Sequence, residues 1–250
     1  MATARLFTRL FLLAFGAVIC LGVDECDDCD VTSEAELAAA FSNENCSGVR
    51  VVAWDSESLV ASVPSHIEGI AVYGDGDSDL RAIAISGSAS VSVSDLPAVE
   101  RVELAGVRSV GLSHLDSLVT ADISYTTSLP RDFEYVLNAS ALPSLTSLAV
   151  VAAEDDRSAT LLLSQVPWGT LEVSSDTVLR RSSLIVSGET MTPETLMSLG
   201  TGMQSILLQS VGDDFVRTYK VWLESEGYEG RLLVESCGPS IDDCEIHVVL

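Results

Sequence analysis

The segment LRAIAI at residues 80–85 decides the fold of this chain, because its pattern recurs along the sequence. A large apolar residue is followed three and five positions later by two more, and this spacing returns in VERVEL (99–104), LVTADI (118–123) and LTSLAV (145–150). The last residues of the four segments, at 85, 104, 123 and 150, lie 19, 19 and 27 positions apart. The alternation that ends each segment, as in Ile83-x-Ile85, is typical of a β-strand with one buried face.

A unit that returns every 19 to 27 residues predicts a solenoid in which each repeat forms one coil. One coil cannot bury its apolar residues alone, so the strands of neighbouring coils have to stack. A second alternation, Val91-x-Val93 and Val110-x-Leu112, lies between the main segments, again 19 positions apart. We therefore expect two strands per coil in a mainly β fold with a few short helices.

The charge of the chain excludes some partners. It carries 37 acidic and 13 basic residues, for a net charge of −24, while 47% of its residues are hydrophobic and suffice for a core. Phosphate backbones are bound by clustered Arg and Lys, so neither nucleic acid nor an anionic membrane surface is expected as a partner. The acidity serves either solubility alone or a face that binds cations or a basic ligand.

Residues 1–22 are predicted to be a secretion signal. Arg5 and Arg9 give a basic start, an apolar run covers residues 10–21, and Gly22 is a small residue before the cleavage point. A membrane span needs about 20 apolar residues, so we expect no membrane insertion after signal removal. The protein is therefore expected to be secreted or held at the extracellular surface.

The cysteines fit an exported protein. Cys20 offers the alternative of a lipid anchor, although Ile19 stands where lipoprotein signals carry Gly or Ala. The others are predicted to form disulfides at both ends of the stack. These are Cys26, Cys29, Cys46, Cys237 and Cys244.

Two pairings follow from the positions of these cysteines. Cys237 and Cys244 close the C-terminal end, whereas Cys46 pairs with only one of Cys26 and Cys29. The thiol left over is either free or links two chains into a disulfide-bonded dimer. Cys26-x-x-Cys29 also has zinc-ligand spacing, but no second such pair and no nearby His completes a set of four ligands.

Helix signals mark both ends of the repeats. Ser33-Glu34-Ala35-Glu36 is a capping box, and the short helix that it starts would cover the first coil, pinned by Cys29 and Cys46. Residues 213–226 are predicted to form a helix with one apolar face, ended by Gly227. The expected organisation is a signal (1–22), an N-terminal cap (23–46), solenoid repeats (47–210) and a C-terminal cap of helix, strand and disulfide (211–250).

The sequence resembles the receptor L-domain family, which includes the leucine-rich-repeat-like domains of growth-factor receptors and fungal cell-wall surface proteins. The likeness rests on the run Asp30 to Leu37 with its spaced Cys46, and on the joints Leu96-Pro97-Ala98-Val99 and Leu142-Pro143-Ser144-Leu145. It covers residues 30–210 and implies a right-handed solenoid, export and a non-catalytic role in ligand binding or surface organisation.

The chain departs from common leucine-rich repeats at one position of each coil. The ladder-forming Asn of those repeats is replaced here by Ser88, Val107, Thr126 and Ala153. A hydrogen-bonded Asn spine is therefore not expected.

Motifs that would indicate catalysis do not occur in the sequence. It has no Gly-x-Ser-x-Gly elbow, phosphate loop, dinucleotide fingerprint or His-Glu-x-x-His, and nothing sets His66, His114 or His247 beside a nucleophile. We therefore expect a protein that is not an enzyme and has no cofactor. A secreted β-helix enzyme that degrades polysaccharides is the least favoured alternative, and it would need a cleft lined by carboxylates.

Metal and glycan sites are weakly indicated. Asp75, Asp77 and Asp79 alternate as at the start of a calcium loop, but Leu80 and Ser86 stand where that loop needs Gly and Glu. A loose calcium site or a solvated turn are the two interpretations. Asn45 and Asn138 fit the glycan acceptor pattern of a eukaryotic secreted protein, and Asn138 is expected in a projecting loop.

The favoured function is non-catalytic binding of a protein or carbohydrate by the outside of the solenoid. The expected contacts are the outward strand residues Ser86, Glu103 and Asp122, together with Phe133 and Tyr135 of a loop or short helix that projects within the 27-residue step. The alternative for this segment is a local insertion that covers a junction between coils. The alternative is a structural cell-wall or matrix component without a specific ligand. An exposed aromatic patch would favour binding, and a uniform Ser, Thr and Asp surface would favour a structural role.

Overall fold

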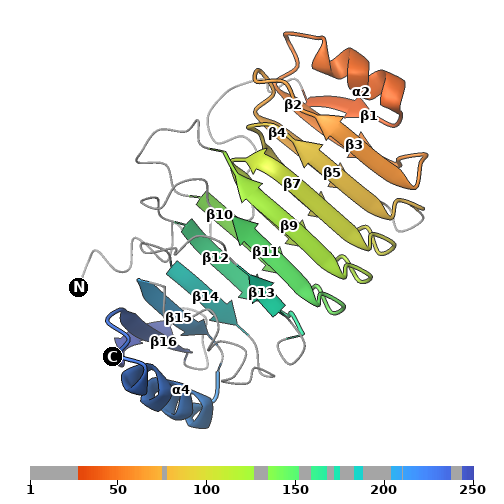
Figure 1. Ribbon diagram of the computed structural model, residues 1–250. Helices are drawn as coiled ribbons and strands as arrows, with labels where there is room; N and C mark the ends of the chain where they lie inside the picture. The colour runs from red at the N-terminus through yellow and green to blue at the C-terminus, as the bar shows by residue number, and fades with distance from the viewer. Residues whose placement is uncertain are drawn as a thin grey trace.

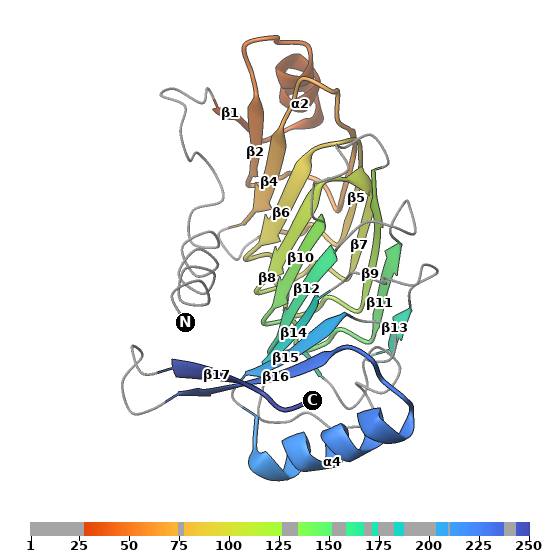
Figure 2. The same ribbon diagram turned by 90° about the vertical axis from the view of Figure 1, so that its left-hand side faces the viewer.

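A computed structural model describes residues 28–74, 78–126, 135–151, 159–167, 172–174, 183–187, 204–209, 211–237 and 244–250. In these residues the chain winds through two β-sheets that face each other, with one helix at each end of the stack (Figures 1 and 2). The fold is a mainly β, parallel solenoid, as the repeat predicted.

The larger sheet, called sheet A, has eleven strands in the described residues. In spatial order they are β1 (Asp28–Val31), β2 (Gly48–Val52), β4 (Gly69–Tyr73), β6 (Ser90–Ser94), β8 (Ser109–Ser113), β10 (Tyr135–Ser140), β12 (Ala159–Ser164), β14 (Ser183–Ser187), β15 (Ser205–Gln209), β16 (Arg231–Cys237) and β17 (Cys244–Val248). Neighbours pair in parallel throughout, except for the antiparallel pair β16–β17.

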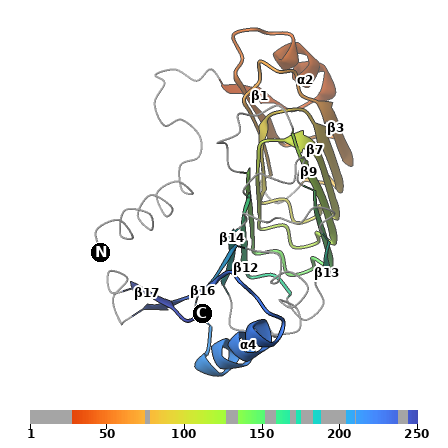
Figure 3. The same ribbon diagram turned by 60° about the vertical axis from the view of Figure 1, so that its left-hand side comes forward.

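The smaller sheet, called sheet B, has six parallel strands in the described residues. They are β3 (Ser58–Ser62), β5 (Ala82–Ser86), β7 (Arg101–Val107), β9 (Thr120–Tyr125), β11 (Ser147–Val151) and β13 (Glu172–Ser174), stacked in chain order. Figure 3 shows the two sheets edge-on, and the buried residues of both sheets form one core.

The recurring apolar pattern forms the stacked rungs of sheet B. Ile83, Val102, Ala121 and Leu148 are successive partners across β5, β7, β9 and β11, and all four are buried. The second alternation does the same in sheet A, where Val91 pairs with Val110 and Val93 with Leu112. From β2 to β13, each coil thus contributes one strand to each sheet, which confirms the prediction of two strands per coil. Burial of such a side chain stabilises the fold by about 1.5–3 kcal/mol, and here the neighbouring coil provides the cover.

The turn out of sheet A has the same backbone form in several coils. The residue after the strand has a positive φ of 48–57° at Ala53, Asp95, His114, Ala141 and Gln165. A tight turn follows in which the amide of Val99 donates to Leu96 O at 3.2 Å, and that of Leu145 to Leu142 O at 3.3 Å. The Leu-Pro-x-Leu/Val joints of the sequence are therefore the corners that lead from sheet A to sheet B.

The N-terminal end is closed by helix α2 (Glu34–Phe41). Ser33 caps it by accepting from the Glu36 amide, and Glu36 Oε2 accepts from the Thr32 amide at 2.7 Å and from the Thr32 hydroxyl at 3.0 Å. These hydrogen bonds from Thr32 lower the pKa of Glu36. The capping box is confirmed, with the Glu36 carboxylate reaching the amide one residue before Ser33.

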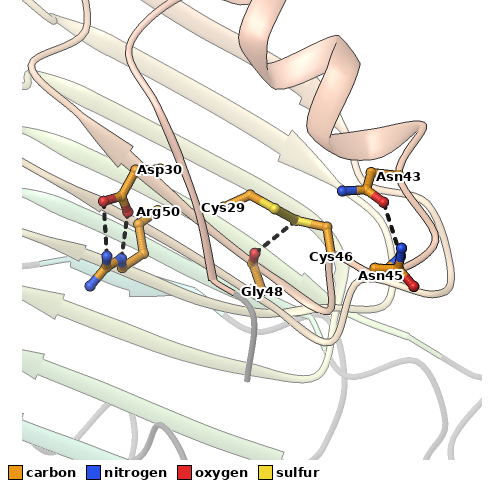
Figure 4. Close-up of a disulfide and its surroundings, with 7 residues drawn as sticks. All are labelled: Cys29, Asp30, Asn43, Asn45, Cys46, Gly48 and Arg50. Carbon is orange, nitrogen blue, oxygen red and sulfur yellow. Dashed lines mark hydrogen bonds and ion pairs between the residues drawn. A yellow bond between two sulfur atoms is a disulfide. The ribbon is translucent and has the colours of Figure 1, made fainter. Parts of the chain in front are cut away.

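A disulfide ties this end together (Figure 4). Cys46 pairs with Cys29 and not with Cys26, and their Cα atoms are 6.1 Å apart. On the same first rungs, Arg50 makes two contacts to the Asp30 carboxylate, at 2.6 and 2.9 Å. Cys26 lies outside the described residues, so the fate of its thiol stays a prediction.

The C-terminal end is closed by helix α4 (Asp213–Ser225), which confirms the helix predicted there. Tyr219 and Leu223 are buried in the same core as Leu208 and Leu232, on strands β15 and β16. Sheet B ends at β13 in the described residues while sheet A continues, and Figure 2 shows α4 lying across this end. The apolar face of the helix therefore packs against the core.

One sequence prediction is wrong: Tyr135 and Asn138 do not lie in a projecting loop. Both belong to β10, where Tyr135 is fully buried and Asn138 is half-buried on the outer side. The Tyr135 ring points inward and stacks on Tyr125, with ring centroids 4.6 Å apart. Tyr135 is thus a core residue and not a ligand contact, while Phe133 lies outside the described residues.

The two stacked tyrosines differ in their hydrogen bonding. The Tyr135 hydroxyl donates to Thr126 O, whereas the Tyr125 hydroxyl is buried and has no hydrogen-bond partner among the described residues. Burial raises the pKa of Tyr125, and the nearby Tyr135 adds to this effect. Removing such a hydroxyl from water costs desolvation free energy, and no hydrogen bond within the protein offsets this cost.

We predict opposite effects of removing the two hydroxyls. Tyr125→Phe should raise the free energy of unfolding by about 1 kcal/mol, because an unsatisfied buried group is removed. Tyr135→Phe should lower it by about 1 kcal/mol, because a made hydrogen bond is lost. Urea unfolding followed by far-UV circular dichroism measures both, and equal losses in the two variants would contradict the assignment.

Candidate functional site

The outer face of sheet B holds three of the residues that the sequence singled out. Ser86, Glu103 and Asp122 lie on the adjacent strands β5, β7 and β9, and all three are partly exposed. Their strand positions alternate with the buried rungs, so their side chains point away from the core. Glu103 and Asp122 are direct partners across β7 and β9, and Ser86 is two positions further along its strand than the partner of Glu103.

Arg101 lies between the two carboxylates. Its guanidinium forms an ion pair with Glu103 on the same strand and lies 3.8 Å from an Asp122 oxygen on the next strand. The sequence analysis did not select Arg101, although its position two residues before Glu103 places it on the same face. We call Arg101, Glu103 and Asp122 the charged cluster of sheet B. Its formal charge is −1, from one cation and two anions.

Small hydroxyl groups surround this cluster. Thr120 is the partner of Arg101 on β9, and Ser124 is the partner of Ala105. The Ser124 hydroxyl accepts from the Gly106 amide at 3.2 Å, at the bulge that interrupts β7. The cluster can therefore donate and accept hydrogen bonds from partly exposed side chains.

Aromatic residues are scarce on the outer strand positions. Within the described strands, Tyr73 of β4 is the one aromatic residue at an outward position. Sheet A instead carries a column of serines on its outer face, formed by Ser94, Ser113, Ser140 and Ser164 on four successive strands. The exposed aromatic patch that would favour binding is not present on these strands.

The other candidate residues do not gather into a site. Asp79 is exposed, Asp75 and Asp77 lie outside the described residues, and no group of three potential metal ligands occurs in the part of the chain that the structure describes. His66, His114 and His247 are exposed and lie on separate elements. His114 Nδ1 is 3.6 Å from Asp95 Oδ1 at a corner of the solenoid.

The two predicted glycan acceptors have different surroundings. Asn45 is exposed in the turn before Cys46, where its backbone N–H donates to Asn43 Oδ1 at 3.1 Å (Figure 4). Asn138 is half-buried on the outer face of sheet A, in register with Gly111 and Leu162. Asn45 is therefore the more accessible of the two.

The C-terminal cysteines are brought together by the backbone. Cys237 of β16 and Cys244 of β17 are direct partners in the antiparallel pair. The amide of Val249 donates to Leu232 O at 2.9 Å, so these two residues form a hydrogen-bonded pair. Hydrogen-bonded and non-hydrogen-bonded pairs alternate along antiparallel strands, so Cys237 and Cys244, five positions further along, form a non-hydrogen-bonded pair. Such pairs have a Cα separation of about 4.5 Å, which a disulfide can span.

We predict that the oxidised protein contains a Cys237–Cys244 disulfide beside Cys29–Cys46. Proteolytic digestion without reductant, followed by mass spectrometry, should yield a peptide that links residues 237 and 244. Cys237→Ser should lower the free energy of unfolding by about 2 kcal/mol, the value expected for a short closed loop. Free thiols at both positions in the oxidised protein would contradict this pairing.

A second prediction concerns Arg101. Arg101→Gln should lower the free energy of unfolding by about 0.5 kcal/mol, because like charges on adjacent strands repel. Adding Asp122→Asn should recover most of this loss, and a double-mutant cycle in urea measures the coupling. The control is Arg81→Gln, which removes one exposed pair with Glu100 at 3.1 Å and should cost less. Equal costs without recovery would show that Arg101 does not hold the cluster together.

Comparisons with protein-family models, with curated proteins and with solved structures found no match to this chain. Among the described helices, none has the length and apolar character needed to cross a membrane.

Proposed function

We propose that this chain is a secreted or cell-surface binding protein without catalytic activity, of the receptor L-domain type. In this proposal the outer face of sheet B contacts a protein or carbohydrate ligand. The observation that carries it is the charged cluster of Arg101, Glu103 and Asp122, which lies on the outer face of the sheet beside Thr120 and Ser124.

The cluster is suited to recognition because the hydrophobic core does not depend on its three side chains. Its side chains are outward and half-exposed, with 45–58% of each exposed, while the stacked aliphatic residues beneath them stabilise the sheet. Arg101 contacts both carboxylates, which restricts their rotamers before any ligand arrives. A pre-organised group loses less conformational entropy on binding, so hydrogen bonds to a ligand retain more of their free energy.

Export is supported by the cysteines and by residues 1–22. The Cys29–Cys46 disulfide is of the kind that persists in oxidising compartments. The basic start and short apolar run of residues 1–22 fit a secretion signal. A right-handed turn of the solenoid and disulfides at both ends complete the proposed architecture.

The second candidate function is a structural cell-wall or matrix component. It is favoured by the serine column of sheet A and by the scarcity of aromatic residues on the described outer faces. Binding sites in proteins are usually enriched in Tyr, Trp and Arg, and only Arg is present in the cluster.

The test uses intact cells of the source organism and the labelled, secreted chain. We expect saturable binding, and we expect Glu103→Gln/Asp122→Asn to weaken it by about tenfold or more, which corresponds to about 1.4 kcal/mol. The matched control is Glu224→Gln, which neutralises an exposed carboxylate on α4. Treating the cells beforehand with protease or with glycosidases distinguishes a protein ligand from a carbohydrate.

Two outcomes would contradict the proposal. Equal binding by all variants would exclude the charged cluster as the contact. Absence of saturable binding, together with retention of the chain in the insoluble wall or matrix fraction, would favour the structural function.

A further inference from the structure

Within the part of the chain that the structure describes, no strand pairs with the outer edge of β17, the last strand of sheet A. β17 ends the sheet and pairs antiparallel with β16, with Val248 opposite Leu233 and Ile246 opposite Glu235. Hydrogen-bonded and non-hydrogen-bonded pairs alternate along such a ladder, and Val249, which donates to Leu232 O, belongs to a hydrogen-bonded pair. Ile246 and Val248 therefore belong to non-hydrogen-bonded pairs, and their N–H and C=O groups point away from β16. In Figure 2, β17 extends outward on the side away from α4.

Of the features that usually protect an edge, β17 has a short length of five residues and one acidic residue, Glu245, and it lacks the others among the described residues. Proteins blunt edge strands with Pro, Lys, bulges or a covering helix. Residues 244–248 include neither Pro nor Lys, their pairing with β16 has no register shift, and Ile246 and Val248 are 41% and 69% exposed. By contrast, the opposite end of sheet A has α2 beside β1 and the Cys29–Cys46 disulfide.

An outward column of aliphatic residues leads to this edge. Leu162, Ile185, Leu207, Leu233 and Val248 are successive partners across β12, β14, β15, β16 and β17. The first four are half-buried, because each has a side chain of the next rung on both sides. Val248 has a neighbour on one side only among the described residues, and it is the most exposed member of the column.

We propose that a second copy of this chain adds to the free edge of β17, so that the two β17 strands pair antiparallel about a two-fold axis. A two-fold contact uses the same edge of both copies and leaves neither edge open. Head-to-tail stacking is disfavoured because α2 and the disulfide stand at the other end of sheet A. The contact is thus a closed dimer rather than a fibre.

This pairing gives hydrogen-bond partners to the outward backbone groups of β17 and a second neighbour to Val248 in the aliphatic column. With Ile246 of one copy opposite Val248 of the other, residues with outward N–H groups face each other, as a bonded pair requires. The same register places the four aliphatic side chains on one face and joins the columns of the two copies. Val248 thereby gains the second neighbour that Leu207 and Leu233 already have.

Net charge sets the salt dependence of this dimer. Each copy carries −24, so long-range repulsion opposes association. The Debye length falls from about 10 Å at 0.1 M salt to about 3 Å at 1 M, which screens that repulsion. The β17 dimer should therefore become tighter as salt is added, whereas a dimer held by ion pairs should become weaker.

Sedimentation velocity on the secreted chain, with free thiols blocked by iodoacetamide, tests the proposal. We expect a reversible dimer at protein concentrations up to about 100 μM, in the range of weak interfaces. Its dissociation constant should fall between about 0.1 M and about 1 M salt. Blocking the thiols excludes a dimer linked by a leftover cysteine.

Two variants identify the edge. Ile246→Pro removes an N–H that points away from β16, so the hairpin should persist while the dimer weakens by tenfold or more. Val248→Thr keeps the side-chain shape and should weaken the dimer less. The matched control, Val60→Thr, changes a valine that is 76% exposed on β3, the edge strand of sheet B, and should have no effect.

Three results would overturn the inference. The first is a monomer at all concentrations and salt levels. The second is a dimer that Ile246→Pro leaves intact while circular dichroism shows an unchanged fold. The third is a dimer that Val60→Thr weakens more than Ile246→Pro does, because that would assign the contact to β3.

Discussion

Lateral stacking of aliphatic side chains, rung upon rung, is the constraint on which this structure depends. Ile85, Leu104, Ile123 and Val150 lie in register on four strands of sheet B, and each is covered mainly by the next coil. A coil taken alone would expose these residues, so stability depends on contacts between neighbours. The same constraint leaves an uncovered rung at each end, which the chain has to close.

The two ends of the solenoid are closed by different means. At the N-terminal end, sheet A begins with β1 before sheet B begins with β3, and the short helix α2 and the Cys29–Cys46 disulfide close this end. At the C-terminal end, sheet A outlasts sheet B in the described residues, and Tyr219 and Leu223 of α4 fill the space that a strand of sheet B would take. The helix covers the inner side of the sheet, which is why the hairpin of β16 and β17 keeps an open edge.

The sequence predicted the inward half of this architecture better than the outward half. Strands between Ile83 and Val150 were found because alternation identifies the buried face, and the 19-residue step identifies the stacking. Tyr135 was misplaced because the 27-residue step hides the phase of β10. The aliphatic column was missed because a run such as Leu161-Leu162-Leu163 has no alternation, and its outward member is visible only through register with Ile185. Arg101 was overlooked because its two partners lie on different strands.

An exterior of this kind limits what it can recognise. Neighbouring coils are about 4.8 Å apart, and outward residues along one strand are about 7 Å apart, so the face offers a regular grid of side chains rather than a cleft. A small molecule would contact few of these positions and remain largely in water. A polymer or a protein surface can contact several rungs at once, and each rung then adds a weak polar contact at little extra entropic cost. The charged cluster, which already spans β7 and β9, is the point on this grid where such contacts would begin.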